Sequence, residues 1–175
     1  MILYVVRHGE ATWNVLNKIC GGQSDVPLTE KGRQQAAQLA QKMPFIDRVL
    51  CSPLQRARET ASILMEGKRI VIKIEPRLRE QNFGDFEGMD RGTEAFLRAK
   101  KEPACHFPNG ESSFQTAARV YSLLDELKAE QSDDSVLLVC HGAIMRIIET
   151  YFRDMPLDEF YRYSPANCTL VRYFL

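Results

Sequence analysis

The stretch Ile2-Leu-Tyr-Val-Val-Arg7-His8-Gly9-Glu10 carries the first signals for both the fold and the chemistry of this chain. Its first part, from Ile2 to Val6, is a continuous apolar run, which predicts a strand covered on both faces. The run changes abruptly into a guanidinium, an imidazole and a glycine. In an open parallel sheet, ligands bind in the crevice at the carboxyl ends of the strands. The polar residues that follow this strand are therefore the first candidates for a functional site.

The rest of the chain alternates short apolar runs with helical patterns. Val136–Cys140 predicts a second fully buried strand, and weaker strand signals lie at 49–51 and 70–74. The residues 168–174 predict a last strand, which we expect at an edge of the sheet. Helical spacing predicts helices after Thr29 as N-cap, over about 53–66, over 111–131 and after His141. For the second of these, Ser52 is the expected N-cap and Pro53 the first helical residue. Strands that alternate with helices imply an α/β fold, with a parallel sheet covered by helices on both faces.

A chain of 175 residues is one domain's worth of protein. We expect a single domain over 1–175, because no linker or repeat divides the chain. The stretch 76–110 differs from the rest in its spacing of Gly and Pro. We interpret it as an insertion, or cap, that lies over one edge of the sheet and contains a short helix near 93–101.

Composition excludes several classes of protein. Lys plus Arg and Asp plus Glu both number 23, so the formal net charge is 0, which disfavours a nucleic-acid partner. The 5 cysteines contain no C-x-x-C pair, which fits neither a disulfide framework nor a zinc ribbon. The N-terminal apolar run is too short for a signal peptide or a membrane span. We therefore expect a cytoplasmic protein with no membrane partner; the sequence has no signal for an oligomeric state.

Cationic and imidazole side chains follow three of the predicted strands. Arg7 and His8 follow the first, Arg56 lies one turn after the strand at 49–51, and His141 follows the strand at 136–140. Helix N-termini point backbone N–H groups at the same crevice, so the combination predicts an anion site, with phosphate as the obvious anion. One histidine can attack phosphorus if its other ring nitrogen holds the proton. The second can donate to the phosphoryl oxygens, and a carboxylic acid would protonate the leaving alkoxide.

Six motifs in order along nearly the whole chain resemble the histidine phosphatase (phosphoglycerate mutase-like) superfamily. The first is Arg7-His8-Gly9-Glu10 with Asn14 four residues on. The others are 22–32 (GQSDVPLTEKG), 52–61 (SPLQRARETA), 78–88 (LREQNFGDFEG), and the later landmarks 108–112 (PNGES) and 141–143 (HGA). The resemblance implies a three-layer α/β/α sandwich, mostly parallel, and a reaction that needs no metal or other cofactor.

The resemblance also implies roles, residue by residue. His8 resembles the nucleophile that becomes phosphohistidine, and Glu80 matches the proton donor to the leaving group. The phosphate-binding positions implied are Arg7, Asn14, Gln23, Arg56 and His141, to which we add Gly142 at the start of the following helix. Glu75, Asp85 and Glu87 stay open as alternatives to Glu80, because they are carboxylates close to it in sequence. His106 has no motif partner and is interpreted as a surface residue.

The chain departs from the family pattern in two ways. Ala11 stands where many members have Thr or Ser, so one hydroxyl beside the site is missing. The chain is also shorter than cofactor-dependent phosphoglycerate mutases, and a small cap lets water reach a phosphohistidine. We therefore expect a phosphatase for a small phosphorylated metabolite. The Pro-x-Gly-Glu-Ser segment is similar to that of α-ribazole phosphatases and of broad-specificity phosphatases, which makes α-ribazole phosphate one candidate substrate.

Other functions stay open from the sequence alone. A phosphoglycerate mutase would use the same residues but return the phosphoryl group to the substrate. A metal hydrolase could use His8, Glu10 and His141 as ligands, although the neighbouring Arg7 would oppose a bound cation. A non-catalytic phosphate-binding module would be expected to lack the nucleophile or the acid, and this chain has both.

Overall fold

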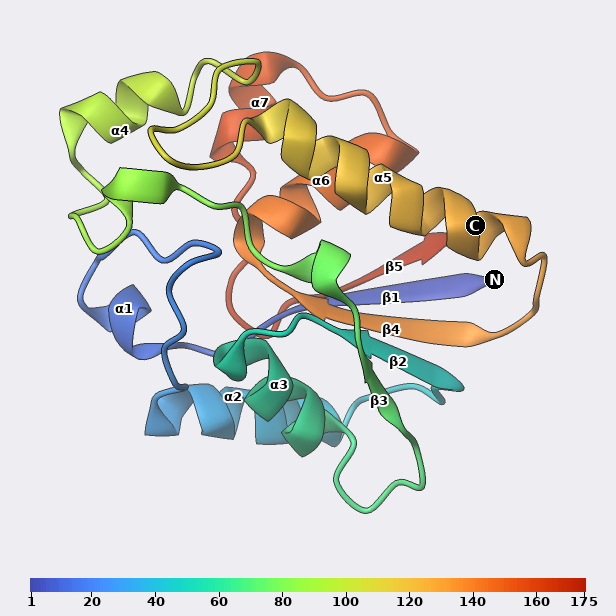
Figure 1. The fold of residues 1–175 in the computed structure, drawn as a ribbon. Coiled ribbons are helices and arrows are strands. Elements are labelled where there is room, and N and C mark those ends of the chain that lie inside the picture. Colours follow the sequence, from blue (N-terminus) through green and yellow to red (C-terminus); the bar gives the residue numbers. More distant parts are fainter.

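The computed structural model describes all 175 residues and contains one central sheet (Figure 1). Its five strands lie in the order β3-β2-β4-β1-β5. They span Ile2–Arg7 (β1), Arg48–Cys51 (β2), Ile72–Ile74 (β3), Ser135–Cys140 (β4) and Leu170–Phe174 (β5). The first four are mutually parallel, while β5 pairs antiparallel with β1 at the edge. The predicted mostly parallel sheet and the last edge strand are confirmed.

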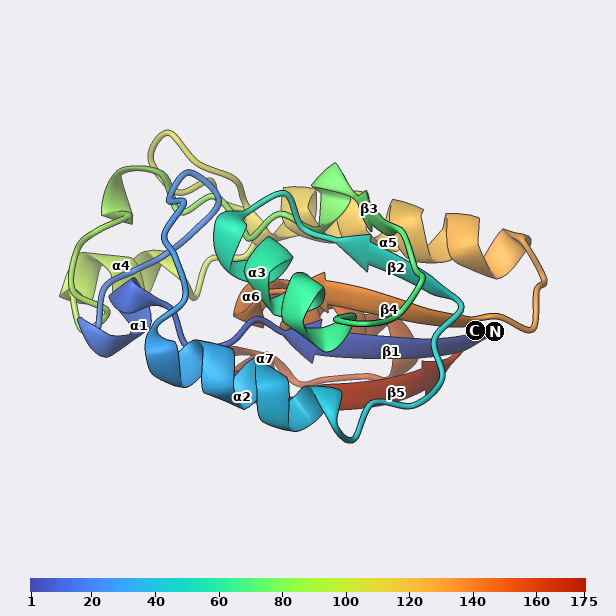
Figure 2. The same cartoon turned by 90° about the horizontal axis from the view of Figure 1, so that it is seen from below.

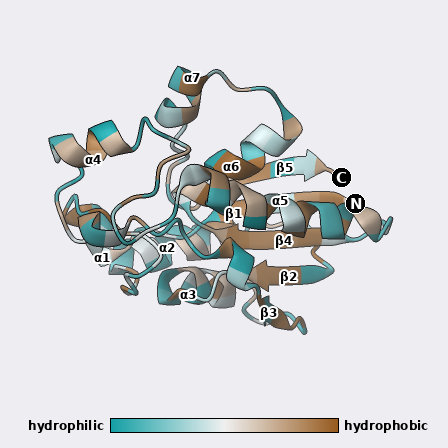
Figure 3. Ribbon diagram, turned by 45° about the horizontal axis from the view of Figure 1, so that its top comes forward, coloured by the Kyte–Doolittle hydropathy of each residue, from teal (hydrophilic) through white to brown (hydrophobic).

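Helices cover both faces of this sheet, which confirms the three-layer α/β/α sandwich (Figure 2). The α-helices span Thr12–Val15 (α1), Glu30–Ala40 (α2), Gln55–Leu64 (α3), Glu94–Ala99 (α4), Ser113–Ala129 (α5), Gly142–Phe152 (α6) and Leu157–Arg162 (α7), and two 3₁₀ turns span Pro76–Leu78 (η1) and Gly84–Phe86 (η2). One core cluster joins α5 and α6 to one face of the sheet, and a second joins α3 to the other face. In Figure 3 the strands β1, β2 and β4 are mainly brown, which marks hydrophobic residues, so the sheet contributes much of this core. None of the helices combines the length and apolar composition that a membrane crossing requires.

Two of the helices begin at the caps that their sequences predict. The Thr29 hydroxyl accepts a hydrogen bond from the Gly32 amide at the start of α2. At α5, Ser112 and Gln115 form a capping box in which each side chain accepts from the other's backbone amide. Such caps satisfy amides that the first turn leaves without partners, and each contributes about 1 kcal/mol.

Three local details differ from the sequence expectations. Helix α3 begins at Gln55 and not at Pro53, and its N-cap is Leu54, because the Ser52 side chain is engaged elsewhere. Phe114 follows the helical spacing of α5, yet it is 62% exposed, since it lies in the first turn beyond the edge of the sheet core. The short helices α1 and α7 were not expected, because neither has a buried residue to mark it in the sequence.

The sheet brings the carboxyl ends of β1, β2 and β4 together. Arg7 pairs with Cys140, and Cys51 pairs with Val139 on the opposite side of β4. The residues that come next in the chain must therefore meet at one edge. Figures 1 and 2 show α1 and α4 beyond this same edge, away from the two chain termini. The segment 76–110 thus extends past the edge of the sheet that the carboxyl ends of the strands form.

Two glycines let the loop after β1 approach α2. A Cβ on Gly9 would lie 2.5 Å from the Gly32 carbonyl oxygen, and a Cβ on Gly32 would lie 2.1 Å from that of Glu10. Both distances are far below van der Waals contact, so larger residues would push the loop away from the helix. This contact fixes the chain direction immediately after Arg7 and His8.

Candidate active site

His8 lies directly after β1 and is 4% exposed. Its Nδ1 lies 2.7 Å from the carbonyl oxygen of Gly9. Because a carbonyl can only accept, Nδ1 must carry the proton, and Nε2 is left unprotonated with its lone pair free. The Gly9 amide in turn donates to the Thr60 hydroxyl at 3.0 Å, which anchors the loop to α3. This is the tautomer that a nucleophilic histidine requires.

His141 faces His8 from the end of β4. The two ring centroids are 5.1 Å apart, and His141 is fully buried. Its Nε2 lies 2.7 Å from the Ser52 hydroxyl, while its Nδ1 is buried and has no hydrogen-bond partner in the protein. The Leu54 amide donates to the same hydroxyl at 3.3 Å, so the hydroxyl proton is free to be donated to Nε2. His141 then carries its own proton on Nδ1, as a donor that points at no protein acceptor.

Burial and positive charge keep both rings neutral. The pKa of His8 lies well below its usual value, first because of burial and then because of Arg56 and Arg7. Burial, followed by Arg56 and His8, likewise lowers the pKa of His141. A neutral imidazole is the form that can attack phosphorus, so the surroundings favour the reactive state of His8 at neutral pH.

Arg56 and Arg7 hold their guanidinium groups in place through backbone carbonyls. Arg56 is 1% exposed and donates to Ser24 O at 2.7 Å and to Gly21 O at 3.1 Å. Arg7 donates to Pro165 O, and burial lowers its pKa. Neither side chain has a carboxylate partner within ion-pair distance, so their positive charges are uncompensated.

Three buried N–H donors have no acceptor in the protein: Arg7 Nε, Arg56 Nε and His141 Nδ1. Buried polar groups without partners are rare, and each costs roughly 1–3 kcal/mol. Here they belong to residues that follow three adjacent strands and that surround His8. We call Arg7, His8, Arg56 and His141 the phosphate centre, because uncompensated cations and free N–H donors are the groups that a phosphoryl anion needs.

Glu80 is the carboxylate that reaches this region. It is 6% exposed; its Oε1 accepts from the Gln81 amide at 2.9 Å and its Oε2 from the Ala143 amide at 3.2 Å, in the first turn of α6. The alternative acids have other contacts. Glu75 binds Arg77, Asp85 accepts from the Asn109 side chain, and Glu87 accepts from Ser24 and from the amides of Gln23 and Phe83. Of the four carboxylates, Glu80 alone lines a cavity with Arg7 and Gly142.

The remaining predicted site residues are Asn14, Gln23 and Gly142. Asn14 caps α1 by accepting from the Ala11 amide at 2.8 Å, so its side-chain oxygen has a structural contact. Gln23 is exposed and donates to Asn109 O at 3.3 Å. Gly142 opens α6 beside Arg7, where a Cβ would make an ordinary contact of 3.6 Å. At Gly142 the backbone amide at the helix N-terminus, and not the missing side chain, is the useful group.

The residue set for a metal hydrolase does not come together. Glu10 pairs with Lys31 at 2.9 Å and accepts from the Thr29 hydroxyl at 2.9 Å, which turns it toward α2. No group of three or more His, Cys, Asp or Glu side chains in the structure could hold a metal ion. The cations Arg7 and Arg56 also surround the two histidines, and they would oppose a bound metal.

Ser52 makes a different contact from the one that its sequence position predicts. We assigned it to a helix cap, whereas the structure places its hydroxyl on His141 Nε2. Its position directly after β2 was the available signal, because that position faces the same edge as His8 and His141.

A model of the histidine phosphatase superfamily (branch 1) matches residues 3–173. The chain belongs to this superfamily. Among curated relatives, a probable phosphoglycerate mutase GpmB of Erwinia tasmaniensis is 33% identical over 97% of this chain and 83% of its own, and that of Photorhabdus laumondii is 35% identical over the same shares. These relatives thus match this chain along nearly its full length.

Solved structures of phosphatases share the fold. A putative alpha-ribazole-5'-P phosphatase from Escherichia coli superposes with a TM-score of 0.86 at 26% identity, covering 98% of this chain and 89% of that one. A mycobacterial glucosyl-3-phosphoglycerate phosphatase gives 0.84 at 29% identity, with 98% and 88% covered. A phosphoserine phosphatase from Entamoeba histolytica in complex with 3-phosphoglyceric acid gives 0.85 at 27% identity, with 99% and 90% covered. This histidine phosphatase family member is therefore an enzyme.

Proposed function

We propose that the protein is a metal-independent phosphomonoesterase that acts through a phosphohistidine on a small phosphorylated metabolite. The observation that carries the proposal is the set of three buried N–H donors without acceptors around the free Nε2 of His8. Donors held in place before the reaction stabilise charge on the phosphoryl oxygens without reorganisation. The solved phosphatase structures support the same reaction class.

The positions of the side chains support the following reaction. His8 Nε2 attacks phosphorus, and the bond from phosphorus to the ester oxygen breaks. Glu80, in its acid form, gives its proton to the departing alkoxide. Arg7, Arg56, His141 Nδ1 and the amides at the start of α6 bind the three phosphoryl oxygens, on which the charge is spread. A water molecule then attacks the phosphohistidine, Glu80 takes its proton, and phosphate leaves His8 free.

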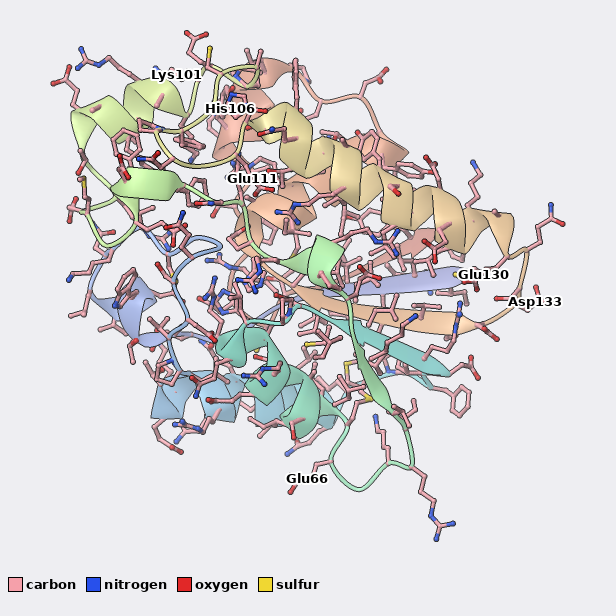
Figure 4. All side chains as sticks on the ribbon, in the orientation of Figure 1. Glu66, Lys101, His106, Glu111, Glu130 and Asp133 are labelled. Carbon is pink, nitrogen blue, oxygen red and sulfur yellow. The ribbon has the colours of Figure 1, made fainter.

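The test is direct. The His8→Ala variant is expected to lose phosphatase activity by at least about 10³-fold, because no other side chain replaces the nucleophile. Wild-type protein quenched during turnover should carry acid-labile phosphate on histidine, and hydrolysis should persist with a chelator present. His106→Ala is the matched control, since His106 is exposed in the loop before α5 (Figure 4). Full activity of His8→Ala would refute the proposal.

Phosphoglycerate mutase is the second candidate, because the curated relatives named above carry that name. The two functions separate in one assay. With 3-phosphoglycerate, a phosphatase releases inorganic phosphate, whereas a mutase forms 2-phosphoglycerate without net phosphate release. We favour hydrolysis because solved structures of phosphatases superpose on nearly the whole chain.

For the natural substrate, α-ribazole phosphate is one candidate, supported by the similarity to the α-ribazole phosphatase structure. We also propose a cytoplasmic location, because all five cysteines are free thiols and two of them, Cys51 and Cys140, are fully buried. Fractionation of cells that express the protein tests this location.

A further inference from the structure

A cavity begins beside Arg7, Glu80 and Gly142 and continues outward, beyond the groups that the proposed reaction uses. It has a volume of about 160 Å³, and it runs from Arg7, Glu80 and Gly142 toward α4 and α7. Figure 3 shows these two short helices on the same side of the sheet as the carboxyl ends of the strands. The outer walls are partly apolar and include Ile19, Phe83, Phe96 and Leu97.

Three further cations line this outer part: Arg91, Lys100 and Arg146. Arg91 donates from Nε to Lys18 O at 3.0 Å, and Arg146 donates from Nε to Tyr163 O at 3.0 Å. Both guanidinium groups are thus anchored by Nε, while their terminal nitrogens have no protein acceptor. Lys100 makes no side-chain hydrogen bond and no ion pair. None of the three has a carboxylate within ion-pair distance, although twelve other pairs form across the molecule.

The hydroxyl of Tyr161 supplies an independent observation. It lies in the same cavity, it is buried, and it has no hydrogen-bond partner in the protein. The buried donors without partners in the phosphate centre led to an anion site, and the same reasoning applies here. We call Arg91, Lys100, Arg146 and Tyr161 the outer cavity.

The charges of the outer cavity oppose one another in the free protein. Burial, followed by the charges of Arg146 and Arg91, lowers the pKa of Lys100 to about 8. Glu80 is the only carboxylate in the lining, and its two oxygens already accept backbone amides. Like charges beside apolar walls repel strongly, because little water screens them. A ligand anion placed between these cations would remove that repulsion.

We propose that the outer cavity binds a second negative group of the substrate, so that the leaving group is itself an anion. This inference rests on the proposed function, since it assumes that the phosphoryl group lies at His8. The substrate class is therefore a phosphomonoester whose leaving group carries a carboxylate or a second phosphate. This separates the inference from the α-ribazole phosphate candidate, whose leaving group is neutral.

The experiment compares esters that differ only in the second group. 3-Phosphoglycerate and glycerol 1-phosphate share a carbon skeleton, with a carboxylate in one and a hydroxymethyl group in the other. Glycerol 1,3-bisphosphate keeps the same skeleton and the C2 hydroxyl, carries a second phosphate, and separates the two anion types. We expect kcat/KM to favour at least one anionic ester over glycerol 1-phosphate by about 10- to 100-fold, the value of one or two charged hydrogen bonds. Equal values for all three esters would overturn the outer cavity as an anion site.

Variants test the residues. Lys100→Gln and Arg91→Gln are expected to reduce the anionic-to-neutral ratio of kcat/KM at least about fivefold. Lys101→Gln removes an adjacent, exposed charge and should keep the ratio of the wild type. A ratio that falls equally in Lys101→Gln would show a general surface charge effect and would overturn the assignment.

A binding measurement separates failure of this inference from failure of the proposed function. Calorimetry with the His8→Ala variant, its fold checked by circular dichroism, gives the affinity of each ester without turnover. Tighter binding of the anionic esters supports the outer cavity even if no ester is hydrolysed, in which case the proposed phosphatase fails alone. Hydrolysis of all esters by the wild type, together with equal affinities in the variant, leaves the phosphatase intact and refutes the outer cavity.

Discussion

The phosphate centre and the outer cavity are neighbours, because Arg7 lines the same cavity as Arg91, Lys100, Arg146 and Tyr161, yet they are held in different ways. The residues of the phosphate centre follow β1, β2 and β4, which lie side by side in the sheet, and His8, Arg56 and His141 are almost fully buried. In the outer cavity, Arg91 and Lys100 lie on or beside α4 and Tyr161 on α7, short helices with few buried residues, while Arg146 is buried on the core helix α6. In our proposal, the groups that act on phosphorus are therefore held by the sheet, whereas three of the four groups that select the substrate lie on short elements that can vary without unfolding the core.

The largest expected effect is at Arg56. Arg56→Ala removes the buried cation and its free Nε, and it leaves the carbonyls of Gly21 and Ser24 without their donor. We expect kcat to fall by about 10³-fold and the melting temperature to drop as well. Arg58→Ala is the control, since Arg58 is an exposed cation on the same helix. Similar losses in both variants would contradict a specific role for Arg56.

Glu80→Gln tests the proton donor. With an alkyl phosphate, kcat should fall by about 10²-fold, because the departing alkoxide no longer receives a proton. With an aryl phosphate, whose phenolate leaves readily, the loss should be much smaller. Glu75→Gln, which breaks the pair with Arg77, should lower stability and leave the dependence on leaving group as in the wild type. An equal loss with both esters in Glu80→Gln would assign the proton transfer to another group.

Ser52→Ala tests the hydrogen bond that orients His141. Loss of this hydroxyl leaves Nε2 without its partner, so the ring is free to reprotonate or turn. We expect kcat to fall by about tenfold, since one hydrogen bond in the buried site is removed while the charges stay. Ser62→Ala, an exposed serine of α3, is the control. Unchanged kcat in Ser52→Ala would show that packing alone orients His141.

The smallest predicted effect is a pH dependence in the outer cavity. Lys100, with a pKa of about 8 in the free protein, is charged below that pH and neutral above it. The groups around it are Arg91, Arg146 and Glu80, together with Tyr161 of α7. The anionic-to-neutral ratio of kcat/KM should therefore fall by about fivefold as the pH rises from 7 to 9, since kcat/KM reports the free enzyme. Lys100→Arg, which stays charged, should abolish the fall; a flat wild-type profile would exclude Lys100 from substrate binding.

Much of the fold was readable from apolar patterns. All five strands and the four longer helices occur where apolar runs and helical spacing predicted them, because buried elements have strong local signals, although the predicted cap of α3 was wrong. The shorter elements α1 and α7 were missed, since they bury no residue that would reveal a period. Phe114 shows the limit of periodicity, because helical spacing states which side a residue is on and not whether a neighbour covers that side.

Within the site, the sequence by itself determined the residues that follow the strands. Arg7, His8, Arg56 and His141 were placed together by strand order alone, and the motifs pointed to Glu80 among four nearby carboxylates. Only the tertiary structure showed that the other three carboxylates have different partners, and that Ser52 binds His141 in place of capping α3. It also gathered Arg91 and Lys100 of the segment 76–110, Arg146 of α6 and Tyr161 of α7, which come from three separate parts of the chain. Contacts between residues so far apart have no local signature, because they depend on how packed elements meet and not on the spacing within any one of them.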